Sequence, residues 1–140
     1  MNLPTTGIVG VGVDAVDVHR FRQLLDRRPG FAARYFSEAE QADAARSANR
    51  SESLAARFAA KEAVMKSLGC GLGAFALIDV EVQRAAGSSF TRNAPSIVLH
   101  AGAAALAEAS GAGCFHLSLT HTTDVAIAFV VAERATCAPS

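Results

Sequence analysis

The residues best suited to chemistry lie in the stretch Arg57–Lys66, RFAAKEAVMK. It contains both lysines of the 140-residue chain, Lys61 and Lys66, whereas the eleven other fixed positive charges are arginines. Lysine is a compact point charge that suits a phosphate, and Glu62 between the two lysines could hold a hard cation such as Mg²⁺. The stretch therefore indicates phosphate and metal chemistry. The simpler alternative is a surface pair of Glu62 with Lys66, one helical turn later.

A second carboxylate, Asp14, follows the apolar segment Ile8–Val13, which we expect to form a buried strand. Side chains alternate along a strand, so Gly10, Gly12 and Asp14 share one face. Glycines let another element approach closely, and Glu62 falls at the edge of an apolar helical stripe. If that helix packs on the glycine face, Asp14 and Glu62 converge and can bind Mg²⁺. The alternative is that Asp14 merely caps the following helix.

Periodicity and capping residues predict the elements that must position these side chains. We expect helices over residues 17–27, 37–48, 51–68 and 101–110, with a Ser37–Glu40 capping box on the second and Ser51 or Ser53 capping the third. The expected strands are 8–13, 77–82, 96–100, 115–122 and 125–132, and residues 31–36 form an apolar connector. Strands joined by hairpins rather than by regular βαβ alternation indicate an α+β fold in a single domain.

Composition excludes several classes of protein. With 51% hydrophobic and 19% charged residues the chain is globular, and its zero formal net charge and lack of Trp argue against nucleic-acid binding. The three cysteines have no ligand-type spacing and fit a reducing compartment. The longest apolar run, Val125–Ala132, is too short to span a bilayer. We therefore expect a cytoplasmic protein without a membrane segment.

Three further features could contact a ligand or partner. Gly69 and Gly71 directly follow the long helix and could present backbone N–H groups, although Gly69 needs no role beyond ending the helix. We expect residues 115–122 to form a strand with an apolar face and a polar face that carries His116, and the simpler alternative for the polar face is an exposed sheet surface. Five arginines between Arg20 and Arg34 face only one acidic residue, which indicates either an acidic partner or a solvated helix face.

Four motifs in this order resemble the holo-[acyl-carrier-protein] synthases, the short type of 4′-phosphopantetheinyl transferase. The motifs are GVGVD at 10–14 with Arg20, RFAAKEA at 57–63 with Lys66, GCG at 69–71, and HLSLTHT at 116–122. The resemblance covers residues 7–133. Two positions depart from the family pattern: Cys70 stands where threonine is common, and Asn93-Ala94-Pro95 replaces a Gly-x-Pro hairpin.

The resemblance implies a mainly antiparallel sheet packed against a long central helix. It implies transfer of phosphopantetheine from coenzyme A to a serine of apo acyl carrier protein, leaving 3′,5′-ADP, as in fatty acid biosynthesis. Asp14 and Glu62 match Mg²⁺ ligands and, with Lys66, catalytic positions. Arg20 and Arg27 match carrier-protein contacts, and a homotrimer with interfacial active sites is expected. The positions that match coenzyme A contacts are Arg57, Lys66, Gly69, Gly71, His121 and Thr122.

We therefore expect one transferase domain over residues 1–140, with an N-terminal extension at 1–6 and a tail at 134–140. Glu62 is the best candidate to take the serine proton, either directly or through a metal-bound water that it orients. Two alternatives stay open. One is a metal-dependent phosphohydrolase acting on coenzyme A or a nucleotide, which would not need the arginine-rich segment. The other is a carrier-protein-binding module without catalysis, against which the presence of Asp14, Glu62 and Lys66 argues.

Overall fold

The computed structural model describes residues 7–71, 73–84 and 94–135. They form five strands, five α-helices and one short 3₁₀-helix in mixed order, which confirms the predicted α+β class. Along the chain, these elements are β1 (Ile8–Asp17), α1 (Val18–Arg27), α2 (Phe31–Tyr35), α3 (Glu38–Arg46), α4 (Arg50–Ser67), η1 (Leu77–Asp79), β2 (Val80–Arg84), β3 (Pro95–Leu99), α5 (Ala101–Ala109), β4 (Ala112–His121) and β5 (Val125–Arg134).

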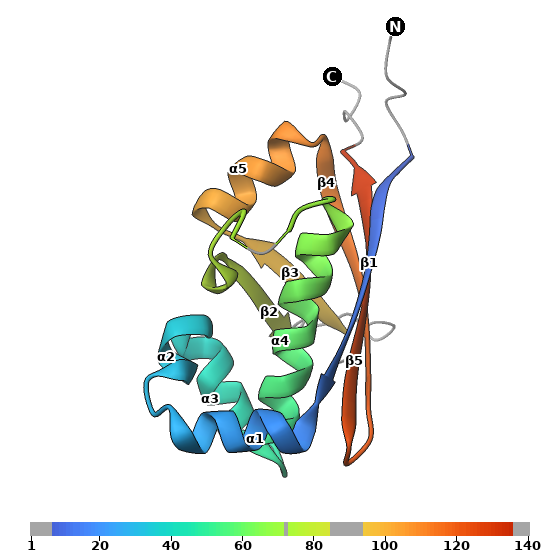
Figure 1. The fold of residues 1–140 in the computed structure, drawn as a ribbon. Coiled ribbons are helices and arrows are strands. Elements are labelled where there is room, and N and C mark those ends of the chain that lie inside the picture. Colours follow the sequence, from blue (N-terminus) through green and yellow to red (C-terminus); the bar gives the residue numbers. More distant parts are fainter. Residues whose placement is uncertain (1–6, 72, 85–93, 136–140) are drawn as a thin grey trace, which may run out of the picture.

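Two antiparallel sheets and the central helix α4 make up the architecture. The larger sheet has the strand order β1-β5-β4, and the smaller one pairs β2 with β3. Helix α4 runs along one face of the larger sheet, with α1, α2 and α3 gathered near its N-terminal end (Figure 1). The expected packing of an antiparallel sheet against a long helix is therefore confirmed.

Glycines on β1 allow α4 to lie directly on the strand. A Cβ at Gly10 would lie 2.1 Å from the carbonyl oxygen of Ser67, and one at Gly12 would lie 1.9 Å from that of Ala63. Real Cβ atoms do not approach backbone this closely, so the contact requires glycine at both positions. Alanines of α4 complete the interface, and Ala63 is fully buried. The predicted glycine face of the first strand is therefore the face that packs on the helix.

Lys61, a fully buried residue of α4, connects this helix to α3 and to the segment that contains η1 and the start of β2. Its Nζ donates to Glu40 Oε1 at 2.8 Å and to the carbonyl oxygens of Leu77 and Val80. Glu40 also closes the predicted capping box with Ser37. A buried ion pair of this kind tolerates no loss of one partner, because the other charge would stay desolvated. Lys61 is therefore a structural residue.

Some predicted boundaries were wrong. Asn49 caps α4, not Ser51 or Ser53, because its side chain accepts the Glu52 N–H. Residues 31–35 form the helix α2 rather than a connector, and η1 replaces the first half of the strand predicted at 77–82. Helix α3 ends at Arg46, two residues before the predicted end.

Strand β1 is longer than expected, because its pairing with β5 continues to Asp17 and Val125. Asp17 caps α1 by accepting the Arg20 N–H at 2.9 Å, so Asp14 is not the cap. Strand β5 extends to Arg134, the first residue of the predicted C-terminal tail, and residues 136–140 of that tail lie outside the described residues. The expected hairpin connection between the strands predicted at 77–82 and 96–100 falls largely outside the described residues, and the N-terminal extension at 1–6 falls wholly outside them.

The face of the larger sheet away from α4 carries large apolar side chains. Val11 and Val13 on β1 are 56% and 54% exposed, and Phe129 on β5 is 45% exposed. Val13 lies directly opposite Phe129, and Val11 opposite Val131. We call this set of four residues the open apolar face. Among the described residues, no helix is both long and apolar enough to cross a bilayer.

Candidate active site

Asp14, Glu62 and Lys66 converge where the glycine face of β1 meets α4. Asp14 follows Gly10 and Gly12 at two-residue spacing, so its side chain continues toward the helix. Lys66 Nζ lies 3.0 Å from Asp14 Oδ1 and donates to the Val13 carbonyl oxygen at 3.0 Å. The Asp14 side chain is only 12% exposed, whereas that of Lys66 is 53% exposed. Lys66 therefore contacts a largely buried carboxylate and is also accessible from solvent.

The environment raises the pKa of Glu62 from 4.5 to about 7. Burial is the largest cause, followed by the negative charge of Asp14 and a hydrogen bond between the two carboxyl groups. The charge of Lys66 opposes this shift. A carboxyl group with a pKa near neutrality can gain and lose a proton under physiological conditions, which is the property of a general base.

The effect of Asp14 on the pKa of Glu62 also tests whether these two carboxyl groups suit Mg²⁺. Two carboxyl groups that share one partly buried place repel each other when both are ionised, and Lys66 supplies only one compensating charge. A hard divalent cation would relieve the repulsion through oxygen ligands, and Mg²⁺ is usually held by one or two carboxylates plus waters and phosphate oxygens. Asp14 and Glu62 therefore fit the expected ion.

Arg57 and His121, both predicted to contact coenzyme A, line a cavity of about 550 Å³. The cavity lies between the start of α4, strand β2 and the end of β4. The described residues that line it do not include the converging trio. They are Ser47, Ala48, Asn49, Glu52, Ser53, Ala56, Arg57, Val82, Gln83, Arg84, Pro95, Leu119 and His121.

The guanidinium group of Arg57, at the cavity wall, is bound by other groups of the same chain. Its Nη1 donates to the Val82 carbonyl oxygen at 2.6 Å, and its Nη2 lies 3.6 Å from Asp43 Oδ2. Burial lowers the pKa of this guanidinium, opposed by the nearby carboxylates. His121 is more exposed, with its Nδ1 3.6 Å from Glu52 Oε2. Of the two, only His121 presents a polar side chain that a ligand can easily reach.

The remaining predicted contacts lie on loops and on α1. Gly69 has a positive φ of 70° just after α4, as expected of a residue that ends a helix. Gly71 is exposed. Thr122 Oγ1 accepts the N–H groups of Asp124 and Val125 in the β4–β5 turn. Arg20 and Arg27 are exposed on α1, which directly follows the strand that carries Asp14.

Sequence reasoning missed several residues of the cavity wall. Glu52 is paired with His121 although nearly seventy residues separate them, and Arg84 reaches the cavity from another sheet. Asn49 carried a usable signal, since a residue of this type next to a helix start is a preferred cap. The Glu52 and Arg84 positions follow from tertiary packing, which no local pattern reports.

The fold and the paired carboxylates define an α+β protein with a site suited to phosphate chemistry. A profile of the 4′-phosphopantetheinyl transferase superfamily matches residues 10–130. The chain therefore belongs to the 4′-phosphopantetheinyl transferase superfamily.

Individual proteins agree with this assignment. The chain is 49% identical over 126 residues to the holo-[acyl-carrier-protein] synthase of Frankia alni, covering 90% of this chain and 98% of the relative. It superposes on the crystal structure of the same type of enzyme from Neisseria meningitidis with a TM-score of 0.79 at 28% identity, covering 91% of this chain and all of the other.

A third comparison involves a bound ligand. The Bacillus anthracis holo-(acyl-carrier-protein) synthase, solved in complex with CoA (3′,5′-ADP), has a TM-score of 0.70 at 30% identity, covering 91% of this chain and 98% of that one. The likeness to solved structures thus extends over nearly the full length of both chains.

Proposed function

We propose that this protein transfers the 4′-phosphopantetheine group of coenzyme A to a serine of an apo acyl carrier protein. The products are the holo carrier protein and 3′,5′-ADP. The curated relatives of similar length are holo-[acyl-carrier-protein] synthases. The observation that carries the proposal is the convergence of Asp14, Glu62 and Lys66 where the glycine face of β1 meets α4.

Glu62 and Lys66 act on the reacting groups in the proposed reaction. Glu62 accepts the proton of the serine hydroxyl, whose oxygen then forms a bond to the phosphorus that carries the pantetheine arm. The bond from that phosphorus to the oxygen of the 3′,5′-ADP group breaks, and the electron pair leaves with the nucleotide. Lys66, exposed on one side and held by Asp14 on the other, supports the negative charge of the reacting phosphate.

Asp14 and Glu62 are the proposed ligands of Mg²⁺. The ion, when bound, would neutralise charge on the phosphate groups. The support for this assignment is the unbalanced negative charge of the pair, which already displaces the pKa of Glu62. Asp14 has a second proposed role, because its Oδ1 accepts a hydrogen bond from Lys66 Nζ at 3.0 Å and so positions the ammonium group.

We further propose a homotrimer with active sites between subunits. Within one chain, the cavity that contains His121 and the trio of Asp14, Glu62 and Lys66 are separate features. A neighbouring subunit could bring its cavity to the trio, with its His121 and Thr122 toward the nucleotide and its Arg57 in the cavity wall beside them. Gly69 and Gly71, which follow the helix of the trio itself, would then lie beside the phosphates. The open apolar face supports self-association, because exposed patches of this kind mark interaction sites.

Arg20 and Arg27 on α1 are the proposed contacts for acidic side chains of the carrier protein. Both are exposed and lie on the helix that follows the Asp14 strand. The cytoplasmic location stays a prediction. It is supported by the free thiols of Cys70 and Cys114 among the described residues, as in a reducing compartment.

Incubation with coenzyme A, Mg²⁺ and an apo carrier protein, followed by intact mass analysis of the carrier, tests the proposal. We expect a mass gain of one phosphopantetheine group and formation of 3′,5′-ADP. A control carrier with its acceptor serine replaced by alanine should stay unmodified. Release of free phosphopantetheine without carrier modification would indicate a hydrolase and contradict the proposal.

A further inference from the structure

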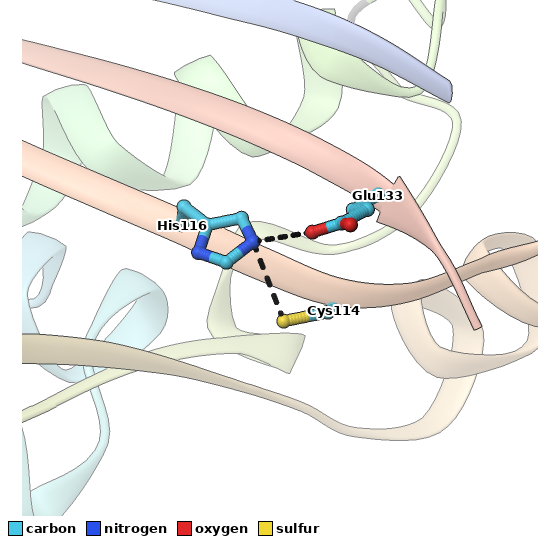
Figure 2. A group of neighbouring side chains, drawn as sticks. All are labelled: Cys114, His116 and Glu133. Atoms are coloured by element: carbon cyan, nitrogen blue, oxygen red, sulfur yellow. Dashed lines mark hydrogen bonds and ion pairs between the residues drawn. The ribbon is translucent and has the colours of Figure 1, made fainter. Parts of the chain in front are cut away.

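Three potential metal ligands from two strands meet on the face of the larger sheet that points away from α4, at the edge of the open apolar face. Cys114 and His116 come from β4 and Glu133 from β5, and one ligand atom of each lies within 4.8 Å of the others. In Figure 2 the His116 ring faces both the Glu133 carboxylate and the Cys114 sulfur. We propose that these three side chains form a zinc site, separate from the proposed transferase site.

A β-bulge brings the ligands to one face. Ala112 pairs with Arg134 and Cys114 with Glu133, so Gly113 is the extra residue of the bulge. Residues 112 and 114 would share a face in a regular strand, but Ala112 is buried and Cys114 is exposed. The bulge therefore turns Cys114 to the side on which His116 lies, a re-aiming that bulges commonly produce.

The distances are close to those that zinc requires. In a tetrahedral site with Zn–N of about 2.0–2.1 Å and Zn–S of about 2.3 Å, the nitrogen and sulfur lie about 3.5 Å apart. Cys114 Sγ lies 3.6 Å from His116 Nε2. Glu133 Oε2 lies 2.7 Å from the same nitrogen and would move away by about 0.6 Å to reach tetrahedral spacing. Both side chains are about half exposed, so this movement meets little resistance.

The ligand types favour zinc over the hard cation proposed at Asp14 and Glu62. Thiolate and imidazole suit Zn²⁺, whereas Mg²⁺ prefers oxygen alone. One thiolate and one carboxylate neutralise the charge of the ion, and a water can occupy the fourth position. Binding would displace the thiol proton of Cys114, so the affinity should rise with pH.

The two proposed metal sites use opposite faces of the sheet. Asp14 shares the face of Gly10 and Gly12, which packs against α4, whereas the exposed side chains of Cys114 and His116 lie on the other face, near the end of β5. Cys114 and Glu133 are cross-strand partners, so a bound ion would tie β4 to β5 beside the last residues of the sheet. The cluster lies on the same sheet face as the open apolar face, since His116 pairs directly with Val131. The zinc site needs ligands from one chain only, and its test reads metal binding rather than transfer. Its failure is therefore distinguishable from failure of the proposed transfer reaction.

The test is titration of the full-length protein with ZnCl₂ by calorimetry, in millimolar Mg²⁺ to saturate the carboxylate pair. We expect one zinc ion per chain and a thiolate-to-metal absorption band when Co²⁺ replaces zinc. Loss even of a residue that only supports a ligand commonly costs 10–100-fold in metal affinity. Cys114→Ser, His116→Gln and Glu133→Gln should each therefore weaken binding at least ~10-fold.

Cys70 provides a matched control, because its thiol forms a hydrogen bond with the Leu68 carbonyl oxygen at the end of α4 and it is not part of the cluster. Cys70→Ser should bind zinc as the unmodified chain does. Zinc should raise the melting temperature of Cys70→Ser but not that of Cys114→Ser, and the two variants should have the same melting temperature in EDTA. Absence of saturable binding, or equal binding by Cys114→Ser, would overturn the proposal.

Discussion

The carboxyl group of Glu62 has a pKa of about 7, so near neutral pH it is protonated in about half of the molecules. Burial and the adjacent Asp14 both favour the protonated form, and Lys66 opposes them. Electrostatic repulsion between two neighbouring carboxylates is characteristic of sites that bind cations or move protons. It also predicts a cost in stability whenever both groups are ionised without a cation.

That cost predicts a dependence of stability on pH in the absence of metal. The pKa of Glu62 is about 7 in the folded protein against an ordinary value of 4.5, so between these values the folded state binds more protons. Its contribution to the free energy of unfolding is full below about pH 4.5 and is lost as the pH rises through about 7. Such a shift corresponds to at most about 3 kcal/mol, and partial exposure of Glu62 reduces it.

We therefore expect Glu62→Gln to be more stable than the unmodified chain by about 1–2 kcal/mol at pH 8 in EDTA, and by much less at pH 5. Urea unfolding at both pH values measures this. Glu81→Gln serves as a control, since its carboxyl group has a lowered pKa and is not part of the trio. Equal pH dependence in Glu62→Gln and the unmodified chain would contradict the assigned pKa.

The two lysines of α4 have separable roles. Lys61→Met leaves the Glu40 carboxylate buried without its partner, so we expect a loss of about 3–5 kcal/mol in the free energy of unfolding. Lys66→Met removes an exposed side chain and should cost less than about 1 kcal/mol, while transfer activity falls by about 10²-fold or more. Urea unfolding and the mass assay measure both. A Lys61→Met variant as stable as the unmodified chain would contradict the structural role of Lys61. A Lys66→Met variant with unchanged transfer activity would contradict the catalytic role of Lys66.

At the scale of elements, the close contact of β1 with α4 determines whether the site forms. Gly12→Ala would place a Cβ 1.9 Å from the Ala63 carbonyl oxygen, so backbone must move. We expect a loss of about 3 kcal/mol or more in stability, at the upper end of overpacking costs. Gly30→Ala is the matched control, since no described atom lies within 4 Å of the added Cβ there. A Gly12→Ala variant as stable as Gly30→Ala would contradict the packing.

Much of the element order could be predicted from the sequence, because local signals and tertiary packing agree there. The capping box of Ser37 with Glu40 and the glycine after α4 are signals of this kind. The segment at Leu77 is an exception. Its apolar alternation predicts a strand, but the Leu77 carbonyl oxygen accepts a bond from Lys61, and a 3₁₀ turn forms instead.

The convergence of Asp14 with Glu62 was predictable for a related reason. Glycines at two-residue spacing identify the strand face that a helix can approach, and the next residue on that face is Asp14. The zinc cluster was not predictable, since the three cysteines show no ligand-type spacing. Its geometry depends on a bulge at Gly113 and on the cross-strand pairing of Cys114 with Glu133, which the sequence pattern does not report.

At the scale of the whole molecule, the open apolar face predicts self-association. Phe129→Glu places a charge in the middle of this face, opposite Val13, and should convert the proposed trimer to monomers without unfolding the chain. Light scattering after gel filtration measures the mass. Ile78→Glu is the control, because Ile78 is also exposed but lies outside the larger sheet.

The same variant tests whether active sites need two subunits. If the cavity of one chain serves the trio of its neighbour, the monomeric Phe129→Glu variant should lose transfer activity although its own Asp14, Glu62 and Lys66 are intact. Ile78→Glu should keep both its mass and its activity. A fully active monomer would contradict the interfacial arrangement while leaving the transferase reaction itself in place.

The most direct measurement of the central claim is intact mass analysis of the apo carrier protein after reaction with coenzyme A and Mg²⁺. The unmodified chain should add one phosphopantetheine group, and EDTA should prevent this. Asp14→Asn and Glu62→Gln should fold normally and lose transfer by at least about 10²-fold, because each removes a proposed ligand and Glu62→Gln also removes the proposed base. Transfer by either variant at the rate of the unmodified chain would contradict the claim.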